Sequence, residues 1–295
     1  MLKKLFKYDV KAVGRFWWIA AVTMLALIVL SGVAMSSYIF NFITMASGVD
    51  FDIVNFLVIM ISYFAMLICM IGVGACFIAV EILIFIRYFK HLFTDEGYLT
   101  FTLPVSRKDI FLSKVISGAF WNCMTFLVAA IGYVIATAIV FVPYLADEGI
   151  RPYFIELVRV IVNGIEIPAT QYLWFALWGI IAVIGVIASA VMSVCMTYFC
   201  ITFGATVAKK GKIAAAIGIY YGMASIGAFV FETLISLGTV FMSAGAIEIL
   251  LRTSALDINV IITLVLVLVA AIISTLAAFF YSITCNILER KLNLA

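Results

Sequence analysis

Charge is scarce in this sequence. Only 11% of its 295 residues are Asp, Glu, Lys or Arg, whereas 67% are hydrophobic. A soluble domain of this length could not bury so much apolar surface, so the composition excludes a soluble protein and predicts an integral membrane protein. The net charge of +3 gives no indication of nucleic-acid binding, and we expect no nucleic-acid partner.

The common motifs of catalysis and cofactor binding are also missing. The chain has no GxxxxGK[ST] phosphate loop, no HExxH, no GxSxG, and no GxGxxG after a strand. Its six cysteines form no CxxC pair, and the single histidine, His91, neighbours Lys90, where a solvated position is favoured over catalysis. We therefore expect no enzymatic site, no metal site and no cofactor bound by this chain.

Long apolar runs are what the sequence has in place of these motifs. Runs of about 20 residues or more can cross a hydrocarbon core of about 30 Å, and their lack of alternation predicts helices rather than a β-barrel. We predict an all-α integral membrane protein, with residues 1–295 forming one transmembrane domain. Its six transmembrane helices are predicted at about 16–38, 55–86, 111–142, 172–205, 213–240 and 258–285.

The basic residues predict the orientation of these helices. If the N-terminus is cytoplasmic, 15 of the 18 Lys and Arg residues fall in inner segments, and only Arg151, Arg159 and Arg252 fall in outer ones. The outer segments hold most of the acidic residues instead. By the positive-inside rule, both termini are expected to be cytoplasmic in a multi-pass protein of a cell membrane.

Three further segments have patterns of their own, and the last of them overlaps the end of the fifth predicted span. Residues 1–15 read as a basic amphipathic helix in the inner headgroup layer, in contact with membrane lipids. Within the outer segment 143–171, helical spacing of apolar residues predicts a short amphipathic helix on the outer leaflet. The apolar stretch 234–256 is either a helix extension or a re-entrant hairpin.

Two carboxylates fall within predicted spans. Glu81 in the second span either pairs at the inner surface or belongs to the transmission machinery, and Glu232 in the fifth is either a structural hydrogen-bonding group or a substrate-facing carboxylate.

Small residues recur every four positions on two spans, a pattern typical of helix–helix packing. The predicted packing positions are Gly185, Ser189, Gly218 and Gly222.

The densest polar segment is TDEGYLTFTLPVSRKDIFLSK, within residues 87–114, which we call the 87–114 connector. Gly97 can take a bend that other residues resist, and Pro104 ends the half-apolar turn before it. Ser106 then offers an N-cap, with Asp109 three residues later. The pattern predicts a short, stiff helix at about 95–103 between the second and third spans.

This connector resembles that of bacterial ABC-2-type exporter permeases, with Pro-Val-Ser-Arg (104–107) as its most diagnostic part. The resemblance implies a transport subunit without its own ATPase, on which a separate ATPase subunit docks through a coupling helix. ATP and Mg would bind to that ATPase, and a second permease subunit would complete a homo- or heterodimer. The implied docking residues are Asp95, Glu96, Gly97, Tyr98, Leu99, Phe101, Thr102, Leu103, Pro104, Val105, Ser106 and Arg107.

The function expected from this resemblance is ATP-driven export by alternating access. The apolar outer halves of the spans suit an amphipathic or hydrophobic substrate, such as an antimicrobial peptide, a drug or a lipid-like molecule. Two other functions stay open: an ATP-independent secondary transporter or channel, and a non-transporting immunity or scaffold protein. A secondary transporter needs ionisable residues near the midplane, where the sequence supplies few.

Overall fold

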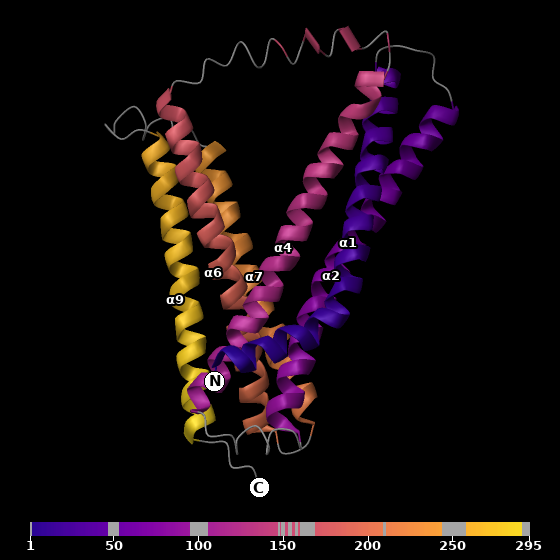
Figure 1. Ribbon diagram of the computed structural model, residues 1–295. Helices are drawn as coiled ribbons and strands as arrows, with labels where there is room; N and C mark the ends of the chain where they lie inside the picture. The colour runs from indigo at the N-terminus through magenta and orange to yellow at the C-terminus, as the bar shows by residue number, and fades with distance from the viewer. Residues whose placement is uncertain are drawn as a thin grey trace. The chain divides into compact units, whose positions relative to one another are not determined.

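The computed structural model describes residues 2–46, 53–94, 106–146, 148, 151–152, 155–156, 159, 169–208, 211–243 and 258–290. Across these residues every regular element is helical (Figure 1). The helices are α1 (Leu2–Ala46), α2 (Ile53–Phe93), α4 (Arg107–Ala146), α6 (Ala169–Val207), α7 (Lys212–Ser243) and α9 (Ile258–Arg290). The prediction of an all-α fold is confirmed for this part of the chain.

Five of these helices, α1, α2, α4, α6 and α9, are long and apolar enough to cross a membrane. Their lengths exceed the roughly 20 residues that a hydrocarbon core requires. The chain is therefore a multi-pass membrane protein. Over its described residues α7 is not among these five helices, so the sixth predicted span stays a prediction.

Some predicted segments lie partly outside the described residues. Residues 2–15 are helical and continue without interruption into the rest of α1. Residues 234–243 continue α7 as a helix, while 244–257 lie outside the description. Of the segment 143–171, α4 includes Pro143 and ends at Ala146, and only a few of the residues that follow are described.

The chain divides into two compact units, and α1, α2 and α4 each contribute residues to both. Unit 2 comprises Val10–Leu83 and Trp121–Pro168. Its core is a cluster of apolar side chains from α1, α2 and α4. The backbones of α1 and α4 approach closely where Gly32 of α1 faces Ala136 of α4. The buried residues at the centre of this cluster are Met24, Ile28, Val73, Ala129 and Ala136.

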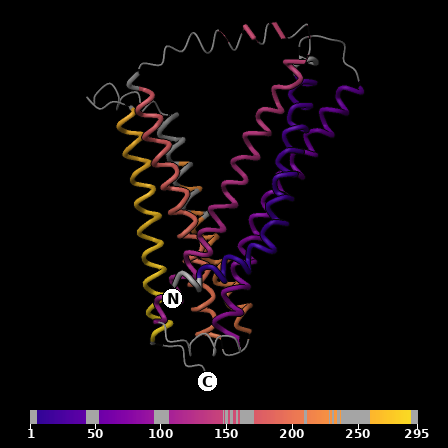
Figure 2. The backbone as a smooth tube through the Cα atoms, viewed as in Figure 1, coloured from indigo at the N-terminus to yellow at the C-terminus, as the bar shows by residue number. Residues whose placement is uncertain are grey.

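Unit 1 comprises Met1–Asp9, Ile84–Phe120 and Ala169–Ala295. Within it α6 packs against both α7 and α9, as the backbone trace of Figure 2 shows. Gly204 of α6 lies against the backbone of Ala216 in α7, where an added Cβ would come within 2.7 Å of the Ala216 nitrogen. Gly211 directly precedes α7 and has a φ of 73°, which favours glycine.

Candidate functional site

The 87–114 connector is described only at its two flanks. Arg87 to Phe93 form the end of α2, and Thr94 follows it. Ser106 precedes α4, and Arg107 to Lys114 form its start. The predicted docking residues between them lie outside the described residues, so the coupling helix at 95–103 stays a prediction. Those residues are Asp95, Glu96, Gly97, Tyr98, Leu99, Phe101, Thr102, Leu103, Pro104 and Val105.

Ser106 caps the N-terminus of α4, as the sequence predicted. The backbone N–H of Asp109 donates to Ser106 Oγ over 3.1 Å, and the Ser106 hydroxyl donates to Asp109 Oδ2 over 2.7 Å. The first of these bonds satisfies one of the amides that a helix start leaves unpaired, and the acidic side chain in the first turn complements the helix dipole. Ser106 therefore determines that α4 begins at the next residue, Arg107.

Two cations next to this cap bind the end of α9. Arg107 Nη1 donates to the backbone oxygen of Leu288 over 3.0 Å and to that of Glu289 over 3.4 Å. Lys108 Nζ lies 3.4 Å from Glu289 Oε1. Because the last carbonyls of a helix have no partner within it, cations at this end are favourable. Of the predicted docking residues, Arg107 is thus engaged with α9.

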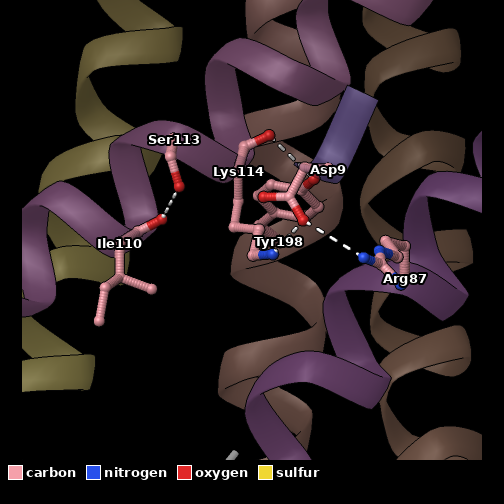
Figure 3. A network of polar contacts seen from close by, with 6 residues as sticks. All are labelled: Asp9, Arg87, Ile110, Ser113, Lys114 and Tyr198. Atoms are coloured by element: carbon pink, nitrogen blue, oxygen red, sulfur yellow. Dashed lines mark hydrogen bonds and ion pairs between the residues drawn. The ribbon is translucent and has the colours of Figure 1, made fainter. Parts of the chain in front are cut away.

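A buried ionic cluster lies within unit 1 close to both flanks of the connector (Figure 3). Lys114 Nζ lies 2.5 Å from Asp9 Oδ1, and both side chains are almost inaccessible, with exposed fractions of 6% and 5%. Arg87 Nη2 lies 3.6 Å from the same oxygen, and 32% of its side chain is exposed. Figure 3 shows the carboxylate between the two cationic side chains.

The cluster uses only part of the hydrogen-bonding capacity of Asp9 and Arg87. Asp9 Oδ2 and Arg87 Nε are both buried, and neither has a hydrogen-bond partner within the described part of the chain. A buried polar atom left unpaired is unfavourable, because it has lost its bonds to water. Arg87 Nε is a donor and Asp9 Oδ2 is an acceptor, and the two residues already form an ion pair.

Two aromatic side chains, Tyr88 of α2 and Tyr198 of α6, pack next to the cluster. The Tyr198 hydroxyl donates to the backbone oxygen of Lys114 over 3.3 Å, and its ring stacks on that of Tyr88 with centroids 3.8 Å apart. Tyr88 is fully buried, and its hydroxyl shares a 2.9 Å hydrogen bond with Thr202. Gly118 leaves room for Tyr198, since an added Cβ would lie 3.1 Å from its hydroxyl. The packing therefore holds α2, α4 and α6 together beside the charges.

The two predicted carboxylates lie elsewhere and in different units. Glu81 belongs to unit 2, where its Oε1 accepts a 2.8 Å hydrogen bond from Asn122 Nδ2 of α4. Glu232 belongs to unit 1 and is exposed on α7. Neither residue is part of the cluster around Asp9. Their proposed roles in transmission or along a substrate pathway stay predictions.

The predicted packing positions have few neighbours in the described part of the chain. An added Cβ at Gly185, Gly218 or Gly222 would meet no described atom within 4 Å, and the Ser189 hydroxyl donates to the backbone oxygen of Val186. The close α6–α7 approach occurs instead at Gly204. Over the described residues no group of three or more His, Cys, Asp or Glu side chains could hold a metal ion.

Sequence reasoning missed Asp9, although the sequence contains a signal for it. Asp9 is the only acidic residue before Asp50, and it begins a stripe with spacing of three or four that is otherwise apolar. The structure buries this whole stripe. A lone acid on the apolar face of a basic helix predicts a buried cationic partner. The stripe consists of Asp9, Val13, Trp17, Ala21, Met24 and Ile28.

Comparison with known proteins adds no family to this description. No protein-family model, no curated protein and no solved structure matches the chain.

Proposed function

We propose that the chain is the membrane-spanning permease subunit of an ATP-driven exporter in a bacterial cell membrane. It has six spans with both termini in the cytoplasm, an N-terminal helix that begins in the inner headgroup layer, and a coupling helix at 95–103. A separate ATPase subunit, which binds ATP and Mg, docks on that helix. A second permease subunit completes the transporter, and the substrate is amphipathic or hydrophobic.

The observation that carries this proposal is the anchoring of both flanks of the 87–114 connector. Arg107 and Lys108 hold the start of α4 to the end of α9, and Arg87 and Lys114 both lie close to Asp9. A connector fixed at both ends passes a displacement to the helices it joins, whereas a loosely held loop absorbs it. The resemblance of residues 95–114 to ABC-2-type connectors gives the partner its class.

The location of the ionic residues favours this function over a secondary transporter. Such a transporter needs ionisable side chains that face one another along a substrate path. In the described residues the buried ionic cluster of unit 1 lies at the connector flanks. Glu81 belongs to unit 2, where it accepts a hydrogen bond from the side-chain amide of Asn122 in the same unit. Charge is therefore concentrated next to the segment that would receive a partner.

Single substitutions in the coupling helix test the proposal. A carboxylate in place of Phe101 or Leu103 puts a charge into an apolar docking contact, where desolvation makes it unfavourable. We expect Phe101→Asp and Leu103→Asp to lower ATP hydrolysis by the co-purified complex about tenfold or more, and to weaken ATPase retention. Ile213→Asn, at an exposed position of α7, is the control. Full transport by this chain reconstituted alone would contradict the proposal.

A further inference from the structure

One carboxylate lies beside both flanks of the 87–114 connector. Arg87 lies in the last two turns of α2, and Lys114 lies near the start of α4. Asp9 belongs to a third element, the N-terminal part of α1, and its Oδ1 atom lies 3.6 Å from Arg87 Nη2 and 2.5 Å from Lys114 Nζ. All three residues belong to unit 1. The N-terminal helix therefore has an electrostatic link to each flank.

Two ion pairs make up this link, Asp9–Lys114 and Asp9–Arg87, which we call the Lys114 arm and the Arg87 arm. They are not equivalent. The Lys114 arm is short and almost fully buried, so it has no room to tighten further. The Arg87 arm is longer and partly exposed, and it leaves Asp9 Oδ2 and Arg87 Nε unpaired in the described part of the chain. Arginine and carboxylate groups form two parallel hydrogen bonds when they meet edge to edge. Such a pair would satisfy both atoms at once.

We propose that Asp9 is a positioning residue for the docking element, and that its Arg87 arm tightens into a two-bond pair when a partner docks. The carboxylate holds the start of α4 through Lys114 in every state. It holds the end of α2 through the longer Arg87 contact in the free chain, and draws that end closer when the connector is loaded. The inference rests on the proposed function for the identity of that partner.

A simpler role for Asp9 is to neutralise Lys114 and nothing more. In that case Arg87 contributes only general positive charge at the end of α2, and lysine could replace it. Lys90, which is exposed in the last turn of α2, supplies the matched comparison because its loss removes one charge nearby. The two roles therefore differ in what they predict for Arg87.

Hydrogen–deuterium exchange on the purified full-length chain in detergent tests the link without any partner. Asp9→Asn should raise amide exchange at the end of α2 and at the start of α4 together, because both arms lose their shared charge. Arg87→Gln should raise it at the end of α2 alone, and Lys90→Gln at neither place. If Asp9→Asn fails to fold, Arg87→Gln still decides the outcome, since it retains the Asp9–Lys114 pair. If amide exchange at the end of α2 is the same in Asp9→Asn and in Arg87→Gln as in the unaltered chain, the proposal is wrong.

ATP hydrolysis by the complex with its co-purified ATPase tests the tightening. Arg87→Lys keeps the positive charge but cannot form two parallel bonds. We expect hydrolysis to fall about tenfold, in line with the loss of one charge-assisted hydrogen bond, while the ATPase stays bound in unchanged amount. Lys90→Gln should hydrolyse ATP at the unaltered rate.

The outcomes separate the inference from the function on which it rests. Hydrolysis at the unaltered rate in Arg87→Lys would show that charge alone suffices, and the proposal would be wrong. Loss of the ATPase from Arg87→Lys would make Arg87 a docking contact rather than a positioning residue, and would also overturn it. If the unaltered chain retains no ATPase, the proposed function fails, and the exchange experiment alone decides the role of Asp9.

Discussion

At the scale of single residues, Lys114 shows why buried charge constrains this protein. Its ammonium group has little access to solvent and lies 2.5 Å from Asp9 Oδ1. A buried ion is tolerated because an opposite charge offsets the free energy of removing it from water. Removing one partner therefore has a larger effect than the net stabilisation by the pair would suggest.

Asp9→Asn is accordingly expected to be strongly destabilising. The substitution keeps the shape of the side chain but leaves Lys114 buried beside a neutral amide, and breaking a buried pair in this way lowers stability by about 3–5 kcal/mol. Glu156→Gln is the matched control, because Glu156 pairs with Arg159 at 3.0 Å on the exposed surface, where such pairs contribute less than about 1 kcal/mol. Thermal unfolding in detergent measures both. Equal midpoints for the two variants would contradict the burial argument.

At the scale of helices, close contact of backbones holds unit 2 together. An added Cβ at Gly32 would lie 2.8 Å from both Cα and Cβ of Ala136, so α1 and α4 meet where neither has a large side chain. In a membrane, where lipid is as apolar as leucine, such packing is a main source of helix association. Trp17 adds a polar link between the same two helices, with its Nε1 donating to Thr125 Oγ1 over 2.9 Å.

Gly32→Ala should therefore separate these two helices. The added methyl group overlaps backbone atoms that cannot rotate away, and overpacking of this kind lowers stability by about 1–3 kcal/mol. The control is Gly74→Ala in α2, where an added Cβ meets no atom of the described residues within 4 Å and helix propensity favours alanine by about 1 kcal/mol. The unfolding midpoint should fall for the first variant and hold or rise for the second. A stabilising Gly32→Ala would show that this contact is absent.

Features that depend on residues close together in the sequence could be predicted, and features that depend on distant residues could not. The helices follow from apolar run length, and the Ser106 cap follows from residues three positions apart, so both could be predicted. The Asp9–Lys114 pair joins residues 105 positions apart, and its formation depends on how the helices pack. The close contact at Gly204 likewise depends on its neighbour Ala216, whereas the predicted stripe at Gly185 was found from spacing alone.

At the scale of the whole molecule, we propose that this chain relies on a separate ATPase subunit to bind and hydrolyse ATP. The apolar helices make it a multi-pass membrane protein, and the 87–114 connector is the segment through which we propose that the partner acts. The ionic links at its flanks give that segment a fixed attachment within unit 1. Transport would then follow from ATP hydrolysis on a different polypeptide.

The most direct measurement of this dependence is ATP hydrolysis by the affinity-purified chain from its native membrane. We expect an ATPase polypeptide to elute with the chain in about equal amount, as one docking site per permease subunit requires, and the eluate to hydrolyse ATP. We also expect Leu103→Asp to remove that polypeptide from the eluate. Transport by vesicles that contain this chain alone, without an ATPase subunit or ATP, would contradict the central claim.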